Sequence, residues 1–374
     1  MAGSIQLSLM IGPGVPTPAL ADVTNALESV QVTSSTGNSG FQLTFKMGKN
    51  SILQTTLLPA GYFDPIITRV IIIATVNGLP SVLMDGVVTR QELAPSNDVG
   101  KSTLTVTGED LSRMMDLVEM PFMRYPGMDM VARVYAILAK YAVLGIVPVA
   151  VPTIPDILNP MEKIPTQTGT DLTYIRQMAS KSGYVFYVEP GPAPGSSIAY
   201  FGPDIRIPAP QPALNINMDA QTNVESLSFS LDGTAKKIVV VTIMDPVTKK
   251  IPITIPLPNI NILRPPLGAR PVVPSKLEFA EGMADLDPAE AINETLGMLM
   301  NTNDAVTGSG SLDVLRYGRV LRSRMLVGVR GAGLAYDGLY YVNSVTHNIK
   351  HGEYKQNFSI SRDGLISNTP AVMT

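Results

Sequence analysis

The sequence predicts a mainly β protein of 374 residues, in which two antiparallel β units flank an α+β insertion. Apolar and polar residues alternate with period two in many short segments, which is typical of strands with one buried face. Turn signals such as Asn77–Gly78 separate these segments. Helical spacing of apolar residues begins only after Gly108, so the predicted secondary structure changes from strands to helices there. The chain is long enough for two or three domains.

The first β unit covers residues 1–108, and we expect residues 216–232 to complete it. Its strand pattern is strongest in four segments: residues 29–47 with a turn at 34–40, 66–76, 82–89 and 101–107. The β-branched run 66–76 ends at Asn77–Gly78, which is a good dipeptide for a tight hairpin turn. These features predict an antiparallel β-barrel or sandwich.

Residues 109–215 are expected to form the α+β insertion. Apolar residues recur at helical spacing in three segments: residues 109–119, 128–144 and the stretch from Asp171 to Gly183. Thr170 or Asp171 is the predicted N-cap of the third helix, because short oxygen-bearing side chains accept from free N–H groups of the first turn. A short strand is predicted at 184–189.

The second β unit covers residues 233–374. After the strand predicted at 224–231, which belongs to the segment that completes the first unit, a strand is predicted at 237–244. The alternation of Ile and Pro in 251–260 indicates an edge strand or extended arm, because proline cannot donate to a ladder. A capping box at 287–290 begins a helix at about 288–303. Residues 307–311 are interpreted as a Gly/Ser loop.

The chain closes with a predicted hairpin whose turn is Lys350–Gly352. In its first strand Leu339, Tyr341, Val345 and Ile349 are expected on one face, with Tyr340, Ser344, Thr346 and Asn348 on the other. In its second strand Tyr354, Phe358 and Ile360 are expected to face the core. Gly331 and Gly338 are expected at positions of positive φ or close backbone approach.

The composition limits the function classes. Charged residues make up 16% of the chain, against a typical value of about 25%. This favours extensive burial against partners, although a β-protein with a polar, uncharged surface is the alternative. A net charge of −3 argues against a general nucleic-acid binder. The absence of cysteine excludes disulfides and thiol chemistry, and the sequence shows neither a signal peptide nor a membrane span.

No motif indicates catalysis or a bound cofactor. Gly100–Ser102 resembles the end of a phosphate-binding loop, but a strand follows it instead of a helix. The two histidines, His347 and His351, are interpreted as a strand residue and a turn residue. Neither forms a zinc site, and no nucleophile elbow supports a triad with Ser344 or Ser359.

The carboxylates show no pattern that brings two acids across a cleft. Those considered are Glu109, Asp110, Glu189, Asp285 and Asp287. We therefore assign no catalytic, cofactor-binding or metal-binding residue and expect the protein not to be an enzyme. The methionines at 114, 115, 120, 123, 128 and 130 are expected mainly in the core, with an adaptable binding surface as the alternative.

Several segments together resemble the phage late control D family, the central baseplate hub proteins of contractile tails and injection systems. The hub portion of type VI valine-glycine repeat spike proteins is similar. The resemblance lies, in order, in LPAGYFDP at 58–65, VLMDGVVTRQEL at 82–93, STLTVTGEDLSRMMD at 102–116, GTDLTYIRQMASKSGYVFYVEPGP at 169–192, NVESLSFSLDG at 223–233, GVRGAG at 328–333, YDGLYYVNSVTH at 336–347 and GEYKQNFSISRDGL at 352–365. Each piece is short, but the ordered set covers most of the chain.

The resemblance implies two tube-like β-barrel domains per chain and a homotrimer at the centre of a baseplate. The trimer would join the hexameric tail tube to a trimeric spike, beside other baseplate proteins. Because the chain ends soon after Leu365, a separate spike protein is implied. The particle, a phage tail or virion or a contractile injection device, would be assembled in the bacterial cytoplasm.

A protein of another class is the alternative. This would be an extracellular β-domain that binds carbohydrate or peptidoglycan, with or without hydrolysis. The absence of tryptophan argues mildly against it, because sugar-stacking platforms favour large aromatic rings.

We expect the purified protein to contain no stoichiometric metal and to need no cofactor, because its two histidines and lack of cysteine supply no zinc ligand set. Elemental analysis of the purified protein checks this. A metal present at one equivalent per chain would contradict it.

Overall fold

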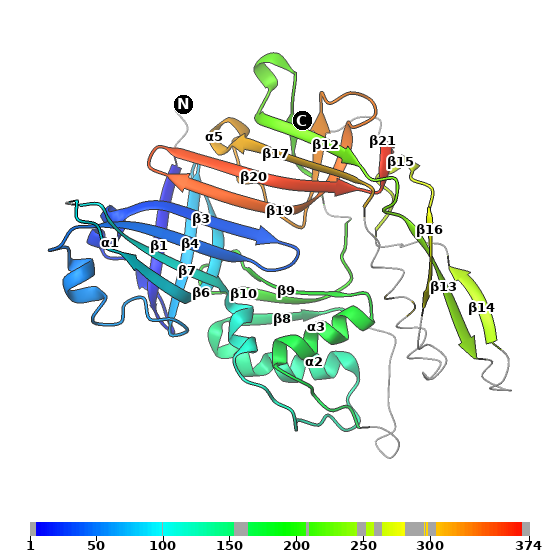
Figure 1. Cartoon of the computed structure of the whole chain (residues 1–374), viewed down its shortest axis with the longest axis horizontal. Coiled ribbons are helices and arrows are strands. Elements are labelled where there is room, and N and C mark those ends of the chain that lie inside the picture. Colours follow the sequence, from blue (N-terminus) through cyan, green and yellow to red (C-terminus); the bar gives the residue numbers. More distant parts are fainter. Residues whose placement is uncertain are drawn as a thin grey trace.

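The computed structural model describes residues 5–98, 100–152, 164–206, 209–244, 252–257, 264–280, 295, 297 and 304–368 (Figure 1). As predicted, the protein is mainly β, with a smaller α+β part inserted between two groups of strands. The helix predicted at about 288–303 lies outside the described residues except for Thr295 and Gly297. No described helix has the length and apolar character needed to cross a membrane.

Most strands belong to one 13-stranded sheet. The N-terminal part contributes β1 (Ile5–Pro13), β2 (Thr17–Pro18), β3 (Leu27–Ser35), β4 (Gly40–Met47), β5 (Thr68–Val76), β6 (Leu79–Ala94) and β7 (Ser102–Asp110). The C-terminal part contributes β11 (Gln211–Asn215), β12 (Val224–Leu231), β17 (Val306–Asp313), β18 (Leu326–Arg330), β19 (Gly338–Lys350) and β20 (Glu353–Arg362). The order is β12-β17-β20-β19-β3-β4-β7-β6-β5-β1-β2, with β18 beside β19 and β11 beside β18.

The pairing of β3 with β19 refines the expected plan of two separate barrels. In two separate barrels, β3 would pair only with strands of the N-terminal half and β19 only with strands of the C-terminal half. They pair with each other instead over seven residues, so one sheet runs through both halves. Likewise, β12 was expected to complete the first β unit, but it pairs with β17 of the C-terminal part. The boundaries of independent domains stay a prediction.

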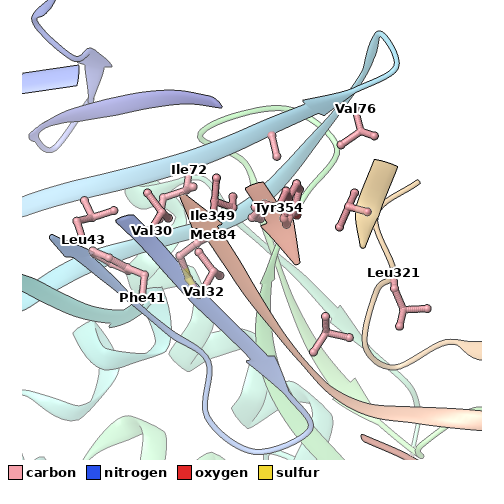
Figure 2. Close-up of a cluster of buried hydrophobic side chains, with 14 of the residues drawn as sticks. Val30, Val32, Phe41, Leu43, Ile72, Val76, Met84, Leu321, Ile349 and Tyr354 are labelled. Atoms are coloured by element: carbon pink, nitrogen blue, oxygen red, sulfur yellow. The ribbon is translucent and has the colours of Figure 1, made fainter. Parts of the chain in front are cut away.

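One face of this sheet forms the main hydrophobic core (Figure 2). Val30 and Val32 of β3, Phe41 and Leu43 of β4, and Ile349 of β19 all lie on it and are buried. Each such side chain contributes about 1.5–3 kcal/mol when it is fully removed from water. The period-two alternation that predicted these strands is therefore the alternation between core and outer face.

Residues 307–311, which were interpreted as a loop, instead form the centre of β17. Gly308 and Gly310 lie under aromatic rings of neighbouring strands. A Cβ at Gly308 would lie 3.0 Å from the Phe229 ring, and one at Gly310 would lie 2.7 Å from the Phe358 ring. The glycines therefore make room for cross-strand aromatic packing, which local sequence does not reveal.

The first strand of the closing hairpin is confirmed, but its predicted faces are only partly right. The pairing of β19 with β20 shifts register between Val342 and Ser344. Such a bulge exchanges the two faces of the strand. Val345 and Ile349 lie in the core as expected, but Tyr340 joins them there, whereas Tyr341 packs in a separate small cluster.

The insertion forms a second core around a three-stranded sheet covered by two helices (Figure 1). Its elements are α2 (Met130–Leu138), α3 (Asp171–Lys181), β8 (Ile146–Ala150), β9 (Val185–Pro190) and β10 (Ser197–Gly202). Thr170 caps α3 as predicted, since its hydroxyl accepts from the Thr173 N–H at 3.2 Å. The helix predicted at 109–119 is shorter, a 3-10 turn at Leu111–Asp116, and the one at 128–144 is α2 followed by a 3-10 turn at Ala139–Leu144.

Smaller elements complete the described fold. β13 (Lys237–Met244) lies between β14 (Pro252–Leu257) and β16 (Lys276–Ala280), so the Ile/Pro segment is an edge strand as expected. β15 (Gly268–Pro271) pairs with β21 (Gly364–Ser367). Short helical turns lie at α1 (Ala21–Ala26), Leu53–Leu57, Asp219–Gln221 and α5 (Val314–Tyr317).

A buried polar network lies inside the main core at His347. Its Nδ1 lies 2.7 Å from the Tyr354 hydroxyl and 3.1 Å from Nε2 of Gln356. The Gln356 side chain also bonds both backbone groups of Leu321. Because both neighbours of Nδ1 can donate, His347 is a neutral acceptor, and its burial lowers the pKa to about 3.

Replacing Gly331 by Val should lower the free energy of unfolding by at least about 2 kcal/mol. Gly331 has φ +87°, and a Cβ there would lie 1.8 Å from the Ile216 carbonyl oxygen. Gly338→Val should also destabilise, because φ is +126° and the Cβ would lie 2.4 Å from the Ser367 hydroxyl. Gly48→Val is the control, since nothing lies within 4 Å of its Cβ position. Unchanged thermal stability in both variants would contradict this.

Acidification should destabilise the protein through His347. The unfolded histidine titrates near 6.5, so the unfolded state binds a proton that the folded state excludes as pH falls from about 6.5 toward 3. Between pH 7 and pH 5 the free energy of unfolding should fall by about 2 kcal/mol more than in His347→Gln. Burial raises the pKa values of Glu189 and Asp110, so these two carboxyl groups stabilise the folded protein as the pH falls. This contribution is the same in the wild-type protein and in His347→Gln. Denaturant unfolding with the same pH dependence in both would contradict this role.

Candidate functional site

The residues considered for catalysis do not come together in the described structure. Ser344 and Ser359 lie on the outer face of the sheet, whereas His347 lies in the core. His351 lies in the exposed turn between β19 and β20. Ser102 begins strand β7, so no helix follows Gly100 as a phosphate-binding loop requires.

The carboxylates have structural partners. Asp110 is buried and accepts from the Ser112 N–H at 2.9 Å, so it caps a 3-10 turn, and burial raises its pKa. Glu189 lies 3.6 Å from Arg324, whereas Glu109 is exposed on β7. Asp285 and Asp287 lie outside the described residues. Within the part of the chain that the structure describes, no group of three potential metal ligands occurs.

The methionine-rich stretch divides between core and surface. Met115 and Met130 are buried in the second core, as the packing interpretation expected. Met123 and Met128 are exposed, and Phe122, directly before Met123, is 88% exposed. The exposed methionines are not part of the core, and an adaptable binding surface there stays a prediction.

A broad outer face of the main sheet carries short uncharged polar side chains. It spans seven adjacent strands, β12, β17, β20, β19, β3, β4 and β7, which Figure 1 shows side by side. We call it the hydroxyl–amide face. Its members are Ser226, Ser228, Ser230, Thr307, Ser309, Ser311, Asn357, Ser359, Ser344, Thr346, Asn348, Ser29, Gln31, Thr33, Ser35, Gln42, Thr44, Thr103, Thr105 and Thr107.

Strand register aligns these side chains in rows across the sheet. One row runs through Ser228, Ser309, Ser359, Ser344 and Ser35, which are successive cross-strand partners. Neighbours within the rows bond to one another. The hydroxyls of Ser226 and Ser311 lie 2.8 Å apart, those of Ser228 and Ser309 lie 3.1 Å apart, and those of Thr33 and Thr346 lie 3.2 Å apart. These bonds join the hydroxyl groups of neighbouring strands across the face.

Charged side chains also lie on this face, such as Lys46 opposite Thr103 and Lys355 opposite Asn348, and most of them are paired. Lys46 bonds Glu28 at 2.7 Å. Lys355 lies 3.0 Å from Glu225 and 3.3 Å from Glu353. Arg90 pairs with Glu92 on the neighbouring part of β6. Exposed pairs like these add little stability, but they cancel the local field of each charge.

The sequence analysis did not predict the hydroxyl–amide face, although the alternation of polar and apolar residues in its strands was recognised. The alternation of β3, β4, β7, β19 and β20 identified which residues point away from the core. Two facts were needed in addition: that β17 is a strand, and that β3 pairs with β19. Without them the polar residues form two unrelated groups.

Comparison with known proteins supports the fold. No family model matches the chain, and no curated protein matches it. Among solved structures, a tail protein from Neisseria meningitidis has a TM-score of 0.64 at 14% sequence identity, over 97% of this chain and 98% of that chain. The 43 kDa tail protein of prophage MuSo2 from Shewanella oneidensis has a TM-score of 0.63 at 12% identity, over 97% and 100%.

A third solved structure comes from Escherichia coli. It is a component of the type VI secretion system with structural similarity to bacteriophage T4 tail proteins, and it matches with a TM-score of 0.51 at 10% identity, over 93% of this chain and 77% of that chain. At such identities the likeness concerns the fold. The chain therefore has the fold of phage tail proteins and of this type VI secretion component, as the resemblance in its sequence predicted.

Proposed function

We propose that the protein is a structural hub of a contractile tail or injection particle, where it joins the tail tube to a separate spike protein. The observation that carries the proposal is the hydroxyl–amide face, which crosses both halves of the chain on a fold shared with tail proteins. In this function the face lines the central channel of the particle.

The chemistry of the face suits a channel wall. Attraction to nucleic acid comes mainly from Lys and Arg that neutralise phosphates, and the charged groups at this face are largely paired with opposite charges. Stable protein contacts need a desolvated apolar centre, which a face of Ser, Thr, Asn and Gln does not offer. A wall of this kind stays hydrated and holds neither a passing nucleic acid nor a passing polypeptide.

The two β-rich halves of the chain suit a protein that joins a six-fold tail tube to a three-fold spike. Three copies, each with a β-rich half on either side of β3–β19, place six similar units around one axis while the true symmetry stays three-fold. The low charged fraction of 16% fits a protein with much of its surface in such contacts. The role is structural, and the protein is not an enzyme. It is assembled in the bacterial cytoplasm and becomes part of the particle, beside other baseplate proteins.

We expect three copies of the chain in the complex with its spike partner. Each subunit of a cyclic trimer presents two different complementary surfaces, and obligate interfaces of this kind bury about 2,000 Å² or more. Native mass measurement of the complex, or an image of the particle, gives the copy number. A stable monomer in that complex, or six copies per baseplate, would contradict the proposal.

A further inference from the structure

A short segment of the C-terminal half concentrates positive charge on a chain that is otherwise sparsely charged. Residues 314–324 read VLRYGRVLRSR and carry four arginines, whereas charged residues of both signs make up only 16% of the whole chain. Arg316, Arg319 and Arg322 recur at every third position, and all three are exposed. We call residues 316–322 the arginine segment.

The three exposed arginines are not neutralised within the part of the chain that the structure describes. None of their guanidinium groups makes an ion pair or a hydrogen bond there. The nearest acid along the chain, Asp313, accepts instead from the backbone N–H of Arg316 at 3.0 Å and so caps α5. Arg324 differs from the other three, because its side chain is buried and lies 3.6 Å from Glu189. The charged groups at the hydroxyl–amide face are mostly paired, so the arginine segment is an exception on this molecule.

The backbone of the arginine segment is fixed by side chains of other elements. Gln356 of β20 donates to the Leu321 carbonyl at 2.9 Å and accepts from the Leu321 N–H at 3.0 Å. Gln211 of β11 holds both backbone groups of Arg322 in the same way, at 2.9 Å and 2.8 Å. The conformation of this irregular stretch is therefore set by the folded sheet before any partner arrives.

Buried anchors lie between the exposed arginines. Tyr317 follows Arg316 and donates its hydroxyl to a backbone carbonyl of β11 at 2.6 Å. Leu321 precedes Arg322 and is fully buried in the main core. Each anchor fixes the root of a neighbouring arginine, so only the outer part of the side chain has to be ordered on binding. Such preorganisation lowers the entropic cost of a contact.

Two exposed leucines lie beside the arginine segment. Leu315 directly precedes Arg316 and is 38% exposed. Leu79 is 56% exposed and lies two residues from Asn77, whose side-chain amide donates to the Gly318 carbonyl at 3.2 Å. Arginines beside apolar side chains are typical of a surface that binds protein. Attraction to nucleic acid needs many cations along a phosphate backbone, and the net charge of −3 opposes it.

We propose that the arginine segment is a docking surface for an acidic segment of a partner protein. A guanidinium group binds a carboxylate through two parallel hydrogen bonds and is more weakly hydrated than an ammonium group, so it suits this contact. Carboxylates of the partner would pair with the three exposed arginines, and its apolar side chains would cover Leu79 and Leu315. The surface lies at α5, beside β17 and β20 (Figure 1). It belongs to the single chain and does not depend on the proposed hub function.

Binding of a synthetic oligo-glutamate peptide to the purified chain tests the proposal. Fluorescence anisotropy at low ionic strength should show binding that weakens as salt is added, because salt screens exposed charges. The triple variant Arg316→Gln, Arg319→Gln and Arg322→Gln should bind the peptide about tenfold more weakly or worse, because three charge-assisted contacts are lost. Its thermal stability should be unchanged, since the three side chains are exposed and make no ion pair or hydrogen bond in the described structure.

The matched control removes the same amount of charge from other places. Lys49, Arg124 and Arg270 are exposed, make no ion pair with the described residues and lie in separate parts of the chain. The triple variant Lys49→Gln, Arg124→Gln and Arg270→Gln has the same net charge as the first triple variant. It should bind the peptide as tightly as the wild-type protein does, because scattered cations make no preorganised surface.

Three outcomes would overturn the proposal. The peptide does not bind to the wild-type chain, or both triple variants lose the same affinity, so that only net charge matters. The third concerns a DNA duplex of equal charge, which should bind more weakly than the peptide. Tighter binding of DNA that depends on the three arginines would identify a nucleic-acid surface instead. Because the copy number of the hub is measured separately in the complex with the spike protein, neither result decides the other.

Discussion

The pairing of β3 with β19 is the interaction on which the rest of the sheet depends. It joins strands more than 300 residues apart and holds both halves of the chain in one register, from Ser35 opposite Ser344 to Ser29 opposite Lys350. Because side chains alternate with period two, a slip of one residue would put Val30 and Ile349 on opposite faces of the sheet, so one of them would leave the core. The main core and the hydroxyl–amide face are therefore consequences of the same pairing.

The insertion is attached to this sheet by buried charged groups. Arg69 on β5 makes two bonds of 2.7 Å to Asp85 on β6, and Asp85 also accepts from Ser197 of the insertion at 3.2 Å. At a second point the guanidinium of Arg324 lies 3.9 Å from the centre of the Tyr187 ring and bonds the Ser35 carbonyl. Such bidentate and stacked arginines fix orientation as well as distance. Removing one partner would leave a buried charge, so these contacts position the insertion against the sheet.

The low charged fraction now has a structural explanation. Two interpretations were open, burial against partners and an uncharged polar surface, and the hydroxyl–amide face shows that the second applies over seven strands. The first interpretation, burial against partners, stays part of the proposed trimer.

The sequence by itself determined the local structure, because local structure depends on neighbours along the chain. The turn at Asn77–Gly78, the Thr170 cap, the strands of the closing hairpin and the fold class were all predicted correctly. The ordered resemblance also predicted the fold that the solved structures share.

Only the tertiary structure decided which strands meet and therefore what each face contains. Gly308 and Gly310 are typical loop residues until Phe229 and Phe358 pack over them from other strands, and Tyr340 changes face because of one bulge. The hydroxyl–amide face was not predictable for the same reason. Its members come from seven strands distributed over most of the chain, and only hydrogen-bonded register brings them into rows.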